Sequence, residues 1–179
     1  MNTFVKPLWD LAEYEEIQKK LQTNRGLLQI RGCIESQKAH MIYGLSGLFP
    51  CRLILAADER RAKEIYEDYR FYDRQVLYYP ARDLLFFQAD IHGDLLVRQR
   101  MQVIRSLIEE NELTVVTSID GCMDYLQPLI EIDRKLIHID MDCTLDLDDF
   151  SGKLVRLGYE RVAQVEHCGQ FSSRGGILD

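Results

Sequence analysis

The sequence predicts an α/β fold followed by a smaller α+β domain. Over residues 1–127, short apolar runs typical of buried strands alternate with stretches that have the spacing of helices. This alternation indicates a parallel sheet flanked by the helices that join its strands. After Pro128 the pattern changes to one helix and runs typical of antiparallel strands. We therefore predict one domain over residues 1–127 and a second over residues 128–179.

The elements of the first domain follow from apolar spacing and from capping residues. Apolar residues recur at helical spacing through residues 9–22, and Asp58 can cap the helix that follows the clearest strand. Pro80 ends another strand. The predicted order is helix 9–22, strand 27–31, helix 36–45, strand 52–57, helix 59–72, strand 76–79, an aromatic loop at 84–87, helix 95–110, strand 114–117 and a weak helix at 121–126.

The second domain has fewer and shorter elements. Residues 136–141 alternate as a strand does, and residues 147–157 have a helical pattern. Two further runs, 159–167 and 171–178, are predicted to pair as antiparallel strands with a turn near Cys168 and Gly169.

Charge and cysteine content exclude several classes of protein. The net charge of −7 argues against a general nucleic-acid binder, because neutralising phosphates requires clustered Lys and Arg. The five cysteines include no C-x-x-C pair, so neither a zinc site nor a disulfide framework is predicted. No signal peptide and no membrane-crossing run is present. Reduced thiols in the cytoplasm, with no membrane contact, are the expectation.

The segment Gly32–Ala39 lies between a predicted strand and a predicted helix, where a phosphate-binding loop would lie. Gly32 and Lys38 have the spacing of the pattern G-x-x-x-x-G-K-[ST]. However, Gln37 replaces the second glycine, Ala39 replaces the hydroxyl residue, and Glu35 puts a negative charge where phosphate would bind. The match is either a degenerate nucleotide loop or a coincidence of spacing, and ATP hydrolysis is expected in neither case.

An acidic run begins at the end of the predicted strand 136–141. Asp140 and Asp142 form a D-x-D-x-T pattern that resembles the nucleophile motif of haloacid-dehalogenase-type phosphatases, in which the two aspartates act with Mg²⁺. That family places its remaining motifs far downstream, and too little chain follows here. We keep a phosphatase as the alternative function. The preferred interpretation is a solvated turn whose later aspartates cap a helix.

The last eleven residues, 169–179, combine glycines, one aromatic side chain and one arginine. Gly175 and Gly176 allow a sharp turn, which fixes where Arg174 leaves the backbone beside Phe171. Arg161 is expected on the neighbouring strand, so both arginines can offer bidentate contacts to a partner's carboxylates. The plainer alternative is two solvated arginines on a hairpin with Phe171 in the core. Because Asp179 falls within a predicted strand, the chain is expected to be an N-terminal piece of a longer protein.

The pattern L-V-x-x-G-Y-x-R-V at 154–162, followed by G-x-F-x-x-R-G-G-x-L-D at 169–179, resembles the N-terminal, UvrB-like module of bacterial transcription-repair coupling factors (Mfd). The stretch around Tyr79–Asp83, with Arg98–Arg100 after it, resembles the same module less specifically. The segment between Pro80 and Leu95 is too short for the DNA-gripping hairpin of UvrB, so no strand separation is expected.

The resemblance implies a helicase-like α/β domain with a degenerate nucleotide loop (Gly32, Gln37, Lys38, Ala39) and a second domain that docks onto UvrA. Arg161 and Arg174 match UvrA-contacting arginines of the family, and Phe171 packs beneath them or touches the partner. Ser172 stands where UvrB has a third arginine.

The resemblance also implies a non-catalytic module of the bacterial cytoplasm, with no metal and no cofactor. Such a module recruits UvrA for nucleotide-excision repair of lesions that stall RNA polymerase. In the family, the full-length protein is an ATP-dependent DNA translocase. Its contacts with RNA polymerase and DNA belong to other domains.

Overall fold

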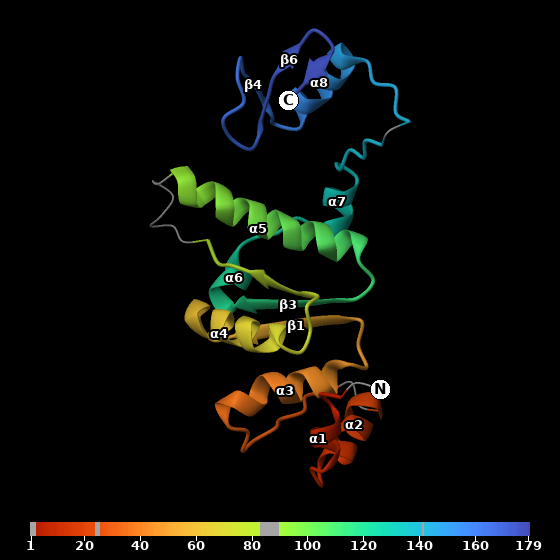
Figure 1. Cartoon of the computed structure of the whole chain (residues 1–179), viewed down its shortest axis with the longest axis vertical. Helices are drawn as coiled ribbons and strands as arrows, with labels where there is room; N and C mark the ends of the chain where they lie inside the picture. Colours follow the sequence, from red (N-terminus) through yellow and green to blue (C-terminus); the bar gives the residue numbers. More distant parts are fainter. Residues whose placement is uncertain (1–2, 24–25, 83–89, 141) are drawn as a thin grey trace.

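The computed structural model describes residues 3–23, 26–82, 90–140 and 142–179 (Figure 1). At its centre is a parallel sheet of β1 (Cys51–Ala56), β2 (Val76–Tyr79) and β3 (Leu113–Ser118), in the order β1-β3-β2. All six residues of β3 are buried, as expected of a central strand that is covered on both faces. The parallel sheet predicted from the sequence is confirmed.

Helix α4 (Glu59–Arg70) covers one face of the sheet. It begins at Asp58, whose side chain accepts the N–H of Arg61 at 2.7 Å, as the cap prediction requires. Its apolar residues Ala62 and Tyr69 are buried against β-strand side chains that include Val116. The helix thus gains its stability from one apolar face packed on the sheet.

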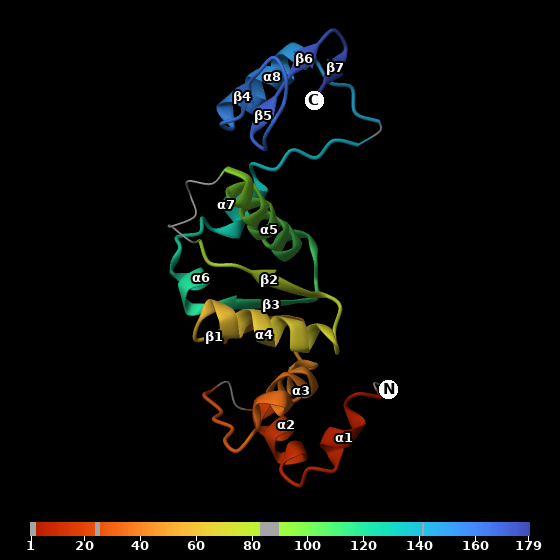
Figure 2. The same ribbon diagram turned by 60° about the vertical axis from the view of Figure 1, so that its left-hand side comes forward.

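Helix α5 (Asp90–Glu109) covers the opposite face, so the sheet lies between α4 and α5 (Figure 2). Val103 and Leu107 pack against Leu113, Val115 and neighbouring residues of β2. The sequence predicted this helix from residue 95, and it starts five residues earlier. The predicted aromatic loop at 84–87 lies outside the described residues.

Three helices form the layer beyond α4, namely α1 (Lys6–Trp9), α2 (Tyr14–Thr23) and α3 (Glu35–Ser46). Their shared core contains Leu8, Tyr14 and Met41, and the Tyr14 hydroxyl donates to the Gly44 carbonyl at 2.9 Å. The single helix predicted at 9–22 is therefore two helices. Within the described ranges no helix combines the length and the apolar character that a membrane span requires.

The predicted strand at 27–31 is wrong, because these residues have no regular secondary structure and join no sheet. Leu27 is 97% exposed, so the apolar run is not buried as a strand of the central sheet would be. β-propensity specifies an extended backbone, whereas a strand also needs a partner edge that completes its hydrogen bonds.

The carboxyl ends of the strands are held together by Glu59. Its carboxylate accepts the Ser118 hydroxyl at 2.6 Å, the N–H of Ala81 at 3.1 Å and the Tyr78 hydroxyl. Burial, followed by this hydrogen bond and the negative charge of Glu59, raises the pKa of Tyr78. The first turn of α4 therefore fixes where β2 and β3 end.

The segment after β2 is anchored by a buried arginine. Arg100 on α5 donates to the Pro80 carbonyl at 2.7 Å and to the Tyr79 hydroxyl at 2.6 Å, and its guanidinium lies 4.1 Å from the centre of the Tyr79 ring. It also pairs with Asp124 at 3.0 Å. These contacts give Tyr79 and Pro80, at the start of the Tyr79–Asp83 stretch, a structural role.

The chain continues from β3 into two short helices, α6 (Ile119–Met123) and α7 (Leu129–Asp133). Helix α7 contacts α5, although it follows the predicted boundary at residue 128; the division into domains stays a prediction. Residues 134–140 form no strand, so the strand predicted at 136–141 is wrong over its described part.

The C-terminal part combines α8 (Leu147–Arg156) with two small sheets. β4 (Glu160–Arg161) pairs with β5 (Gln170–Phe171), and β6 (Ser173–Arg174) forms a hairpin with β7 (Ile177–Leu178). The β6–β7 pair is antiparallel, but β4 and β5 are parallel. The antiparallel pairing predicted between 159–167 and 171–178 is therefore wrong.

Candidate docking surface

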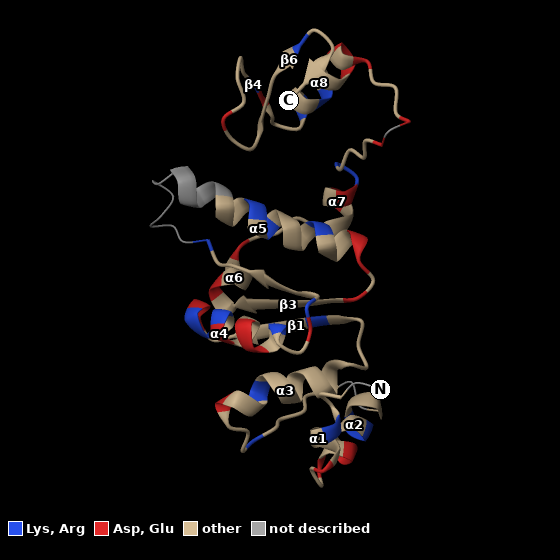
Figure 3. Cartoon of the chain, in the orientation of Figure 1, with Lys and Arg blue, Asp and Glu red and all other residues tan. Residues whose placement is uncertain are grey.

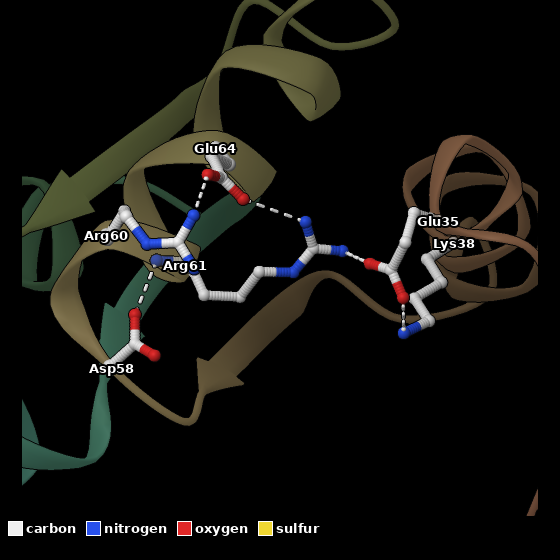
Figure 4. A network of polar contacts seen from close by, with 6 residues as sticks. All are labelled: Glu35, Lys38, Asp58, Arg60, Arg61 and Glu64. Carbon is white, nitrogen blue, oxygen red and sulfur yellow. Dashed lines mark hydrogen bonds and ion pairs between the residues drawn. The ribbon is translucent and has the colours of Figure 1, made fainter.

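In the loop that resembles a phosphate-binding loop, the charged side chains already form ion pairs within the protein. Glu35 at the start of α3 forms ion pairs with Lys38 and with Arg61 of α4 (Figure 4). Arg61 also binds Glu64 at 3.0 Å. Lys38, the residue that a working loop would direct at phosphate, is thus paired with a carboxylate.

Other parts of this loop also have internal partners. The Gln37 side chain accepts the N–H of Ile34 at 3.4 Å, in the manner of the third residue of a capping box. Gly32 has a φ of +87°, so the chain turns there in a conformation that favours glycine. Because the strand expected before the loop is missing, the segment also lacks the strand-to-helix setting of a phosphate loop.

The acidic run forms turns. The Asp140 side chain accepts the N–H of Asp142 at 3.1 Å. Asp146 accepts the N–H groups of both Asp148 and Asp149 at 3.0 Å and caps α8, as the sequence predicted. The structure thus gives the phosphatase alternative no support, because Asp140 ends no strand and its carboxylate serves a turn.

The core of the C-terminal part forms around Phe171. This side chain is 2% exposed and packs with Phe150 and Leu154 of α8 and with Leu178 of β7. Of the two roles considered for Phe171, packing beneath the surface agrees with its burial. Its side chain therefore leaves almost no area exposed to solvent.

Arg174 projects from the β6–β7 hairpin and is ordered by neutral acceptors. Its Nη2 donates to the Ala163 carbonyl, and its Nε lies 3.4 Å from the Ser172 hydroxyl oxygen. The hairpin turn starts at Gly175, whose φ of +60° suits a tight two-residue turn with glycine at its first position. Within the described residues, no carboxylate pairs with Arg174.

Arg161 lies on β4, two residues before the carbonyl that Arg174 contacts. It is exposed, and no described residue forms an ion pair or hydrogen bond with its side chain. The structure thus brings the two predicted arginines to neighbouring segments, although not as residues of one antiparallel sheet. The connection 162–169 explains the difference, because it forms a wide loop in which the Gln170 side chain accepts the N–H groups of Glu166 and His167.

Sequence reasoning missed the structural roles of three residues in this region. Ala163 supplies a carbonyl oxygen, which has no sequence signature. Ser172 is 2% exposed and donates its hydroxyl to that same carbonyl at 3.2 Å. Ile177 is the cross-strand partner of Arg174 and is 65% exposed. The alternation of the predicted strand 171–178 was the one available signal for Ile177.

We define the docking surface as Arg161, Arg174 and Ile177. In Figure 3 the ribbon of β6 includes a basic residue, whereas acidic residues lie before and at the start of α8. A planar guanidinium beside an exposed aliphatic side chain can bind a carboxylate and bury apolar area at the same time. The surface is therefore suited to a protein partner with acidic side chains.

Comparison with known proteins agrees with the resemblance seen in the sequence. Residues 137–179, which contain the whole docking surface, match the family model of the UvrB interaction domain. The chain is also similar to the transcription-repair-coupling factor of Staphylococcus aureus, with 29% identity over 111 residues. That match covers 62% of this chain and 10% of the relative.

Related proteins of two further species give similar values. The transcription-repair-coupling factor of Staphylococcus haemolyticus is 29% identical over 105 residues, which cover 59% of this chain and 9% of the relative. That of Staphylococcus epidermidis is 28% identical over 107 residues, which cover 60% and 9%. The matched part of the chain thus spans about a tenth of these relatives. The similarity to transcription-repair coupling factors predicted from the sequence is confirmed.

Proposed function

Starting from this similarity, we propose that the chain is a non-catalytic recruitment module that binds UvrA through the docking surface. By holding UvrA, it would bring nucleotide-excision repair to lesions that stall RNA polymerase. Contacts with RNA polymerase and DNA are assigned, within the proposal, to other domains of the coupling factor. The match of residues 137–179 to the UvrB interaction domain supports the proposal at the level of the region.

The observation that carries the residue assignment is the lack of acidic partners at Arg161 and Arg174 among the described residues. Arg61 and Arg100, by contrast, are paired with Glu35 and Asp124. An arginine that keeps free N–H groups and no countercharge is ready to form charge-assisted bonds with a partner's carboxylates.

The test is the affinity of the chain for purified UvrA after charge reversal of each arginine. Arg174→Glu and Arg161→Glu should each weaken binding about 10- to 150-fold, because each removes a charge-assisted contact. Arg60→Glu is the matched control. Its side chain is 80% exposed on α4, and it should bind UvrA like the parent.

Circular dichroism and thermal melting should show that all three variants keep the parent fold, since each altered side chain is exposed. The docking assignment is refuted if both Arg174→Glu and Arg161→Glu bind UvrA as the parent does.

We further propose that the Gly32–Ala39 loop binds no nucleotide. The pairing of Lys38 and Arg61 with Glu35 supports this, because phosphate binding would have to break both ion pairs next to a fixed negative charge. Titration calorimetry with Mg-ATP should show no binding heat. A micromolar dissociation constant would mean that the loop works as a phosphate site.

A further inference from the structure

A buried serine, Ser172, lies beneath the docking surface next to Arg174. Ser172 lies between β5 and β6, and its backbone N–H and carbonyl both pair with Asp179, at 3.1 and 2.9 Å. Its hydroxyl points the other way and donates to the Ala163 carbonyl at 3.2 Å. Ser172 therefore connects the segment that carries Arg161 with the hairpin that carries Arg174.

The same hydroxyl oxygen faces Arg174. The Nε of Arg174 lies 3.4 Å from it, and the Nη2 donates to the Ala163 carbonyl. One edge of the guanidinium, formed by Nε and Nη2, is thus occupied by two neutral oxygens. Of the five N–H groups of an arginine, this leaves three, and two of them, one on Nη1 and one on Nη2, form the outer edge that can bind a carboxylate.

We propose that Ser172 is a positioning residue that preorders Arg174 for docking. Binding normally costs the rotamer freedom of a long side chain, and a side chain held before binding avoids part of that cost. Neutral oxygens can hold the guanidinium without cancelling its charge, whereas a carboxylate would cancel it. Among the described residues Arg161 has no comparable support, so the two arginines should differ in order before the partner binds.

The inference rests on the proposed function only where it concerns UvrA. Its first part concerns the free chain and is tested by ¹⁵N–¹H spectra of the arginine Nε groups, recorded at low temperature. The Nε–H of Arg174 should exchange with water more slowly than that of Arg161, and Ser172→Ala should abolish the difference. Equal exchange rates in the parent would overturn the inference, whatever UvrA does.

The second part is a double-mutant cycle with UvrA affinity as the readout. Ser172→Ala should weaken binding about 3- to 10-fold, as expected for one lost hydrogen bond. In an Arg174→Ala background, the same change should have no further effect. Ser173→Ala, one residue along the strand, is the matched control and should bind UvrA like the parent.

The outcomes separate the two claims. If Ser172→Ala weakens binding equally with and without Arg174, the serine acts through the fold and the inference is wrong. Parent-like affinity of Ser172→Ala would also overturn it. If Arg174→Ala itself binds UvrA as the parent does, the docking assignment fails, while the exchange measurement still decides whether Ser172 orders Arg174.

Discussion

The two regions that sequence motifs singled out use their charged side chains in opposite ways. At the Gly32–Ala39 loop, the cations Lys38 and Arg61 are paired with the carboxylate of Glu35 (Figure 4). At the docking surface, Arg161 and Arg174 have no carboxylate partner among the described residues. A charge that is already paired contributes to the fold, whereas an unpaired charge on ordered backbone is available to a partner.

The two regions also show that a recognisable sequence motif need not be a binding site. The loop retains Gly32 and Lys38 of a known pattern, but the residues between them and their neighbours prevent the expected chemistry. The docking surface has a less regular pattern, yet Gly175 and the core beneath it fix where Arg174 projects. The environment of each cation therefore says more about its role than the spacing of the motif.

The largest effect on stability is expected from substituting Phe171. It distinguishes a structural role of this side chain from direct contact with UvrA. Phe171→Ala should cost about 3–5 kcal/mol of stability, because it leaves a cavity between α8 and β7. Chemical denaturation followed by circular dichroism measures this cost. UvrA binding should fall with the folded fraction of the C-terminal part. A stable Phe171→Ala variant that no longer binds UvrA would instead make Phe171 a contact residue.

A smaller effect on stability is expected from substituting Arg61 of α4, whose ion pair with Glu35 links α4 to the loop. Arg61→Ala should lower the free energy of unfolding by about 0.5–1 kcal/mol, because its partly exposed ion pairs with Glu35 and Glu64 are lost. Arg60→Ala is the matched control, since Arg60 is more exposed and, among the described residues, forms an ion pair only with Glu64. Equal costs for the two variants in urea denaturation would contradict the structural role of Arg61.

The smallest effect concerns the pH response of α8, which packs against Phe171 in the core of the C-terminal part. A hydrogen bond from Lys153, together with its positive charge, lowers the pKa of Asp149. The stabilisation is therefore present above the ordinary pKa and is lost as pH falls through the lowered one. Lys153→Met should raise the pKa of Asp149 towards its ordinary value in an NMR titration. An unchanged pKa would show that the pair is not formed in solution.

Much of the central fold could be predicted because its elements depend on local signals. The cap at Asp58, the apolar spacing of α4 and the β-branched run Thr114–Thr117 of β3 are each visible in a short stretch of sequence. The prediction of a strand at 27–31 was wrong because a strand must pair with a neighbouring strand. The sequence of the segment alone does not specify that neighbour. The predicted antiparallel orientation of these segments was wrong because a wide loop, rather than a tight turn, joins β4 to β5.

The docking surface was predictable only in part. Arg161 and Arg174 were found through a pattern of residues, and the cap at Asp146 through helix chemistry. The support given by Ala163 and Ser172 could not be found, because a backbone carbonyl has no side-chain signature and a serine is common in loops. The burial of Ser172 is known only from the arrangement of three separate segments around it.

The central claim is that the chain meets UvrA through its C-terminal surface and not through the Gly32–Ala39 loop. Hydrogen–deuterium exchange of the whole chain, with and without saturating UvrA, tests it most directly. We expect UvrA binding to slow exchange in peptides covering residues 160–178 and to leave exchange in those covering residues 28–45 unchanged. Protection of residues 28–45, with residues 160–178 unaffected, would contradict it.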